Sequence, residues 1–110
     1  MKETQHIKPA RVFPPGRTIK NELEARGWKQ REFAQVIGRP VQYVSDLVRG
    51  KRMLTVSAAR ELEAALGPSA EFWLGLETHY RLWLEDQKGD SEKLADIRRR
   101  VGSRGKALAS

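Results

Sequence analysis

Apolar residues recur at helical spacing through most of the chain, and two such patterns meet at a glycine between Trp28 and Arg52. In the first pattern the apolar positions on one face are Phe33, Ala34 and Ile37. In the second they are Val41, Val44, Leu47 and Val48. This periodicity predicts two short helices in succession, each with one buried face.

The residues between and after these two patterns fit a tight connection. Gly38 is placed to end the first helix, and Pro40 suits the first turn of the second, where its missing N–H costs nothing. Gly50 closes the second helix, and Ala34 is small enough for two helices to cross closely. A helix, a short turn with glycine and a second helix form the helix-turn-helix pattern. The alternative is an αα-hairpin in any small bundle.

The outward face of the second helix favours a nucleic-acid reader over a simple hairpin. An amide, a phenol and a hydroxyl stand there beside basic flanks, which is the mixture that base edges and phosphates require. The residues we expect on this face and its flanks are Arg39, Gln42, Tyr43, Ser45, Asp46, Arg49, Lys51 and Arg52.

Two further helices frame this motif. Ile19 and Leu23 mark the buried stripe of a helix that Gly16 can cap and Gly27 ends, and Trp28 is expected to anchor it to the motif. After the motif, Thr55 is an N-cap candidate and Gly67-Pro68 a terminator. The stripe between them comprises Val56, Ala59, Leu62, Ala65 and Leu66.

A fifth helix, capped by Ser69, carries more apolar surface than one buried face needs. Aromatic residues of this kind are typical of interfaces, so we expect self-association through this helix, with the bundle's central helix as the alternative. The expected dimer-interface residues are Trp73, Leu76, Tyr80 and Trp83.

The chain divides into three parts by composition. Residues 1–15 contain three prolines and are interpreted as an extended arm, and residues 16–88 as the folded domain. Residues 89–110 are interpreted as a basic, flexible tail, in which Leu94, Ile97 and Val101 align over one or two turns at most.

Charge and composition narrow the range of possible functions further. The formal net charge is +7, with +2 in residues 1–11, +1 in residues 12–87 and +4 in residues 88–110. A basic chain suits a polyanionic partner, although basic ends also serve solubility alone. Without cysteine there is no disulfide or thiolate metal site, and no apolar run approaches the ~20 residues of a membrane span. We therefore expect a cytoplasmic protein without metal, cofactor or membrane contact.

Catalysis is not supported by the sequence. His6 lies in the expected arm, and His79 lies on the aromatic helix as a surface or interface residue. None of the common nucleophile, metalloprotease or phosphate-loop motifs is present. We expect no enzymatic activity.

Four stretches make the chain resemble the HigA-type antitoxins, a branch of the Xre/Cro repressor-like helix-turn-helix family. They are PPGRTIKNELEARG, GRPVQ, RGKR and GPSAEFWLGLETHYRLW, and the similarity runs from Pro14 to about Trp83. The resemblance implies an all-α, five-helix, lambda-repressor-like DNA-binding domain that is usually dimeric. It also implies operator DNA and a HigB-type toxin, an mRNA endonuclease, as partners.

The resemblance assigns roles to individual positions. Gln30 matches a phosphate-contacting glutamine, and Arg49, Lys51 and Arg52 match backbone-contact positions. The base-facing positions are occupied by Val41, Gln42 and Asp46, with Tyr43 and Ser45 beside them.

Four positions depart from the general pattern. Arg39-Pro40 replaces an apolar residue and serine, and Lys29 stands where a capping serine or threonine is common. Asp46 is acidic toward DNA, so it either accepts from a cytosine amino group or orients a neighbouring arginine.

Three functions follow as hypotheses. The first is an antitoxin that neutralises a HigB-like toxin and represses its own operon. The second is a stand-alone Xre-family repressor without a toxin. The third is an interaction module whose motif no longer binds DNA, against which the retained Gln30, Gln42, Arg49 and Lys51 argue.

Overall fold

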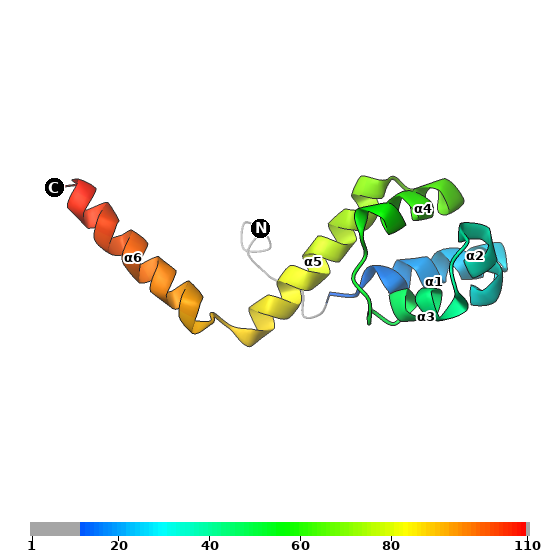
Figure 1. The fold of residues 1–110 in the computed structure, drawn as a ribbon, viewed down its shortest axis with the longest axis horizontal. Helices are drawn as coiled ribbons and strands as arrows, with labels where there is room; N and C mark the ends of the chain where they lie inside the picture. Colours follow the sequence, from blue (N-terminus) through cyan, green and yellow to red (C-terminus); the bar gives the residue numbers. More distant parts are fainter. Residues whose placement is uncertain (1–11, 110) are drawn as a thin grey trace, which may run out of the picture.

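Six α-helices and no strands make up residues 12–109, the part of the chain that this computed structural model describes, with side chains described for residues 12–104 (Figure 1). The helices are α1 (Pro15–Arg26), α2 (Gln30–Ile37), α3 (Val41–Val48), α4 (Val56–Leu66), α5 (Ala70–Lys88) and α6 (Glu92–Ala109). The all-α prediction is confirmed. None of these helices has the length and apolarity needed to cross a membrane.

Four helix ends lie at the glycine and hydroxyl residues that the sequence predicted as caps. Gly27 and Gly38 end α1 and α2 in the left-handed conformation, each with φ of 70°, which glycine adopts without strain. The hydroxyls of Thr55 and Ser69 accept N–H bonds at the starts of α4 and α5, each at 3.1 Å. These caps satisfy backbone groups that a helix start leaves open.

Two helix starts differ from expectation, that of α1 by two residues and that of α3 by one. Pro14 is the N-cap of α1, with Pro15 in its first turn, so Gly16 does not cap the helix. Pro40 is the N-cap of α3 and does not lie in its first turn. In both cases the fixed φ of proline suits the extended cap position as well as the first helical one.

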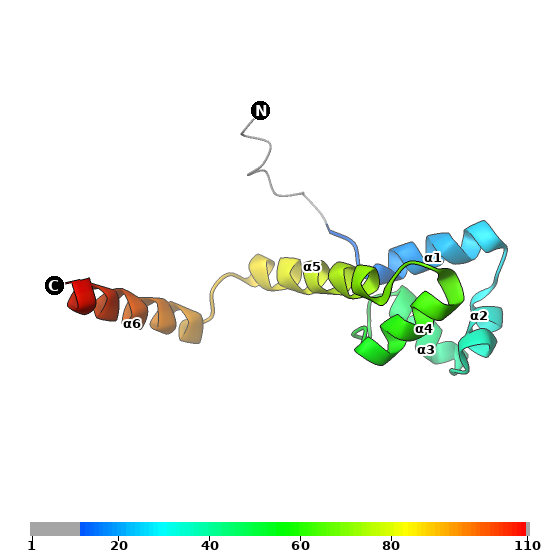
Figure 2. The same cartoon turned by 90° about the horizontal axis from the view of Figure 1, so that it is seen from above.

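The first five helices form one bundle around a shared core. Neighbours in sequence pack together, α2 on α3 and α4 on α5, while α1 packs on both α3 and α5 (Figures 1 and 2). The largest fully buried side chains are Trp73, Phe33, Ile19, Leu62 and Val44. Burial of this apolar set is the main force that holds the helices together.

Gly16 determines how closely α1 approaches the motif. A Cβ atom at this position would lie 2.3 Å from the Leu47 carbonyl oxygen and 2.2 Å from that of Val48. The start of α1 therefore lies directly against the carbonyl end of α3. The partial positive charge of one helix end faces the partial negative charge of the other.

Three apolar residues lie elsewhere than the periodicity predicted. Trp73 is fully buried in the core, and its ring N–H donates to the Pro68 carbonyl at 3.1 Å. The prediction that Trp73 lies in a dimer interface is therefore wrong. Val56 is 64% exposed and Val41 48% exposed, because both begin helices at the edge of the bundle.

The C-terminal segment is a helix, not the flexible tail that we predicted. Ser91 caps α6 through a bond from the Leu94 N–H at 3.2 Å. The helix continues to Ala109, well beyond the one or two turns expected. It extends from the bundle beyond the end of α5 (Figure 1). The bulk of the predicted arm, including His6, lies outside the described residues.

Candidate nucleic-acid interface

The outward face of α3 presents Gln42 in a fixed orientation. Its Nε2 donates to Asp46 Oδ1 at 2.9 Å, one turn along the same helix. This bond leaves Oε1 and the second Nε2 hydrogen of Gln42 available. An adjacent acceptor and donor is the pair that binds N6 and N7 of adenine in the major groove.

The Asp46 carboxylate orients the Gln42 amide. The same Oδ1 lies 3.8 Å from a terminal nitrogen of Arg49, a looser contact. Of the two roles considered for Asp46, the structure supports orientation of neighbours, and the neighbour bonded most closely is Gln42. Its carboxylate also lessens the positive charge close to the base-reading position.

Tyr43 is buried, whereas the sequence placed it on the outward face. The Arg39 guanidinium lies 4.4 Å from the centre of its ring, and the Arg52 guanidinium lies 4.7 Å from it. The exposed fraction of Tyr43 is 9%. Helical spacing alone places Tyr43 at the edge between the buried and the exposed face of α3. The two cation–π contacts hold its ring on the buried side. Tyr43 therefore positions two arginines instead of contacting a groove.

Arg39 is bound to α4. Its Nε and Nη2 donate to the two carboxylate oxygens of Glu61 at 3.0 and 2.8 Å. These hydrogen bonds raise the pKa of Arg39 above its usual value. The expectation that Arg39 contacts DNA does not fit this geometry, because the bidentate pair uses two of its five N–H donors and holds the guanidinium against α4. Its partner lies 22 residues away, so no local spacing could reveal it.

The remaining cations of the motif are accessible. Arg49, Lys51 and Arg52 are exposed at the end of α3, and Ser45 is half-buried. Gln30 is the first residue of α2, whose N-cap Lys29 makes no side-chain cap bond. Unbonded N–H groups at a helix start can donate hydrogen bonds to a phosphate oxygen.

Two basic residues of α1 extend this surface and were missed by the sequence analysis. Arg17 and Lys20 line one hollow of about 440 Å³ with Arg49, beside the end of α3. The close approach at Gly16 brings them there. The sequence did not point to Arg17 and Lys20, because no local pattern shows that the start of α1 packs against the end of α3.

The remaining expected interface residues lie along α5. Leu76 packs partly against the core. Tyr80 and Trp83 are half-buried, and their rings stack at 6.5 Å with an angle of 21°. These two are the aromatic residues of the expected set that keep exposed surface.

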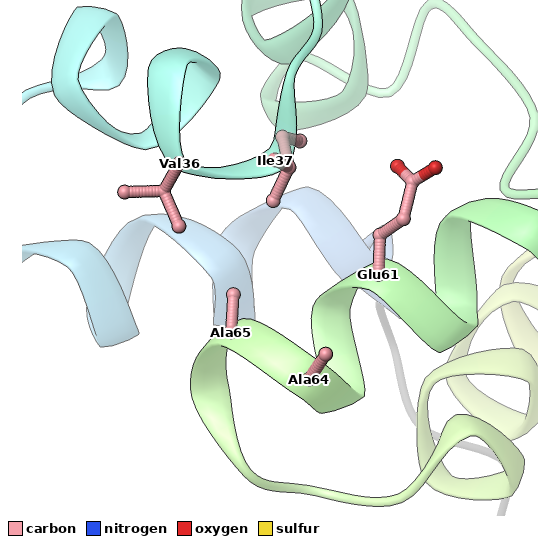
Figure 3. Close-up of a pocket in the computed structure, with 5 residues that line it drawn as sticks. All are labelled: Val36, Ile37, Glu61, Ala64 and Ala65. Atoms are coloured by element: carbon pink, nitrogen blue, oxygen red, sulfur yellow. The ribbon is translucent and has the colours of Figure 1, made fainter.

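A separate shallow hollow lies between α2 and α4, with a volume of about 320 Å³ (Figure 3). Val36, Ile37, Ala64 and Ala65 line it, with Glu61 at one side. Since Glu61 binds Arg39, this hollow offers little polar chemistry. No cluster of potential metal ligands occurs among the residues that the structure describes.

Known proteins are similar to this chain in sequence and in fold. Residues 19–73 match the helix-turn-helix family. The uncharacterized HTH-type transcriptional regulator YddM of Escherichia coli (strain K12) is 31% identical over 84% of this chain and 93% of its own length. Antitoxin HigA-1 of Vibrio cholerae is 38% identical over 62% of this chain and 65% of its own.

One solved structure extends the comparison. The Pseudomonas aeruginosa antitoxin HigA, solved with the higBA promoter, is 26% identical and superposes with a TM-score of 0.65. The match covers 68% of this chain and 83% of that one.

Proposed function

The chain belongs to the helix-turn-helix family, in its Xre-like branch with similarity to HigA antitoxins, and from this premise we propose that it represses transcription as an operator-bound dimer. One observation carries the proposal: Gln42 is held by Asp46 with its adenine-complementary pair of groups facing outward. The exposed Arg49, Lys51 and Arg52 supply phosphate contacts beside it. The Pseudomonas relative bound to a promoter supports the same role.

A dimer places two copies of α3 one helical turn of DNA apart, about 34 Å. Tyr80 and Trp83 on α5 are proposed to contribute to the contact between copies, since large aromatic side chains dominate interface energetics. The operator is then a palindrome.

Footprinting on the DNA upstream of the protein's own gene tests this proposal. We expect two protected half-sites on one side of the duplex, centred about one helical turn apart. A single footprint that shifts freely with sequence would contradict it. Gln35→Ala, which changes an exposed glutamine on α2, is the matched control for substitutions on α3.

The finer proposal is that the protein is the antitoxin of a type II module and neutralises a HigB-like mRNA endonuclease. The similarity to antitoxin HigA-1 supports it. Physical chemistry adds a constraint. An enzyme that binds RNA is itself basic, so it would be repelled by the basic face of α3. The toxin is therefore proposed to bind elsewhere on the protein.

Co-expression with the neighbouring gene tests the toxin partnership. We expect that the neighbour alone arrests growth and that this protein restores it. If the neighbour is harmless, the alternative function is a stand-alone repressor, which the likeness to the regulator YddM favours. The footprint result would stand in either case.

A further inference from the structure

An apolar groove lies at the surface between α5 and the loop that connects α3 to α4. Its apolar walls are Leu74 and Leu82 from α5, with Met53 and Leu54 from the loop between α3 and α4, and its volume is about 380 Å³. Thr78 and the ion pair of Glu77 with Arg81 also line the groove. Met53 is 61% exposed and Leu82 62% exposed. Such side chains normally lie against another surface.

The groove continues toward α6. A second hollow of about 370 Å³ lies at the bend between α5 and α6, and both Leu82 and Leu94 line it. Beyond it, α6 carries Leu94, Ile97 and Val101, exposed by 45%, 40% and 64%. These three residues recur at intervals of three and four and so share one helix face. Within the described residues, this apolar face is uncovered.

The two surfaces match in length. Leu74 to Leu82 spans eight residues, or about 12 Å along a helix axis. Leu94 to Val101 spans seven, or about 10.5 Å. The stripe of α6 is therefore as long as the groove that could receive it.

The two surfaces also match in charge. Glu85 lines both hollows, and Asp86 lines the one at the bend. The described part of α6 is basic, with two acidic residues against Lys93, Arg98, Arg99, Arg100 and Arg104. A basic helix packed along the acidic end of α5 is electrostatically favoured.

The geometry points to a second copy of this chain as the occupant: we propose that α6 of each protomer docks in the α5 groove of the other. In the structure α6 extends away from its own bundle, and Arg98 pairs with Asp90 at the bend (Figures 1 and 2). An extended helix reaches a neighbour's groove more readily than its own.

This exchange is self-complementary. The groove of one copy receives the stripe of the other, and the reverse contact forms at the same time, as a two-fold dimer requires. The inference rests on the proposed function only in taking a dimer as the active form. It is tested without DNA.

Cysteine cross-linking provides the test, because the chain has no cysteine of its own. Met53→Cys and Ile97→Cys are prepared as two separate variants, mixed, and treated with a short bismaleimide. We expect a covalent dimer that contains one chain of each variant. Val36→Cys mixed with Ile97→Cys is the control, since Val36 is 57% exposed but lies in the hollow between α2 and α4. This pair should give no mixed dimer.

A second measurement uses charge. Ile97→Asp should raise the dimer dissociation constant at least about tenfold in analytical ultracentrifugation, because each substitution acts twice in a two-fold interface. Ser103→Asp, on the opposite face of α6, should leave the constant unchanged. Circular dichroism verifies that both variants stay helical.

Two results would overturn the proposal. One is a mixture of the single variants that yields no mixed dimer. The other is a chain with both cysteines that cross-links only within itself. If footprinting still shows two half-sites in that case, the proposed function stands and the dimer forms through another surface.

Discussion

Asp46 fixes the direction of the Gln42 side chain, and this pair sets the chemistry of the recognition face. A free glutamine samples several rotamers and loses that entropy on binding. The bond to Asp46 removes part of this cost before DNA arrives. If α3 reads bases as proposed, the acidic residue on α3 serves specificity although it adds no affinity for phosphate.

Gln42→Ala should cost about 1–3 kcal/mol on the cognate operator and relax base choice at one position of each half-site. Asp46→Ala should cost about 1 kcal/mol, because it frees the amide without removing it. Binding isotherms on cognate and substituted operators measure both. A Gln42→Ala protein with an unchanged preference among bases would exclude this glutamine as a reader.

Arg39 and Lys51 look alike in the sequence but differ in their surroundings. Lys51→Ala should lower the slope of log affinity against log salt by about one unit and leave thermal stability unchanged. Arg39→Ala should leave that slope unchanged and destabilise the fold by about 1–2 kcal/mol. It removes a bidentate ion pair and a contact with Tyr43.

Glu61→Gln is the matched control for Arg39, because it weakens the same ion pair from the α4 side. We expect a smaller loss of stability and no change in salt slope. An Arg39→Ala protein with a slope reduced by a full unit would return Arg39 to the DNA contacts.

The sequence predicted the exposed cations of the motif but not the partners of the half-buried ones. Glycines and capping hydroxyls act within a few residues, so the ends of α1, α2, α4 and α5 were predictable. Arg39 binds Glu61 of α4, which is remote in sequence, and Tyr43 packs against Arg39 and Arg52. Their surroundings could not be inferred from helical spacing.

At the scale of the helices, the contact at Gly16 controls the placement of the recognition helix. Gly16→Ala would push a methyl group into the Leu47 and Val48 carbonyls. We expect a loss of about 1–3 kcal/mol, which is typical of overpacking. Thermal unfolding should show a lower midpoint, by about 4–8 °C for each kcal/mol.

Gly75→Ala is the matched control for Gly16→Ala. Gly75 lies within α5, and a Cβ there meets no atom within 4 Å. Alanine should therefore stabilise the protein by about 0.4–1 kcal/mol through helix propensity and a less flexible unfolded chain. Equal effects of the two substitutions would show that the approach of α1 to α3 is not tight.

The α6 helix illustrates the limit of periodicity at this scale. Its apolar residues were recognised, but two glycines and a run of arginines favoured a flexible segment. Ser91 supplies a cap, and ion pairs from Asp96 to Arg99 and Arg100 lie along the helix surface. Such weak local terms add up over a long helix but are hard to sum by inspection.

At the scale of the whole molecule, charge separates the surfaces available to two partners. Four acidic residues on α1 and α4 are candidates to bind a basic toxin, namely Glu22, Glu24, Glu61 and Glu63. Glu22 pairs with Arg26 and Glu61 with Arg39, so both are already bound within the protein. Glu24 and Glu63 are exposed.

Growth rescue should therefore survive Gln42→Ala and fail, in a folded protein, when Glu24 and Glu63 are both changed to lysine. The physical reason is that a basic toxin needs acidic groups with free oxygens. Co-expression with the neighbouring gene's product measures rescue. Loss of rescue with Gln42→Ala alone would place the toxin on the DNA-reading face.

The packing of neighbours in sequence, α2 on α3 and α4 on α5, also governs how quickly the chain folds. Contacts between successive helices close short loops and have low contact order, which is associated with folding in microseconds to milliseconds. The exceptions are the contacts of α1 with α3, of α2 with α4 and of α1 with α5, and the last of these joins the two helices that are farthest apart in the sequence. We expect this docking to be the late step, so stopped-flow kinetics should show that substitutions in the α2–α3 contact slow folding, whereas those between α1 and α5 mainly accelerate unfolding.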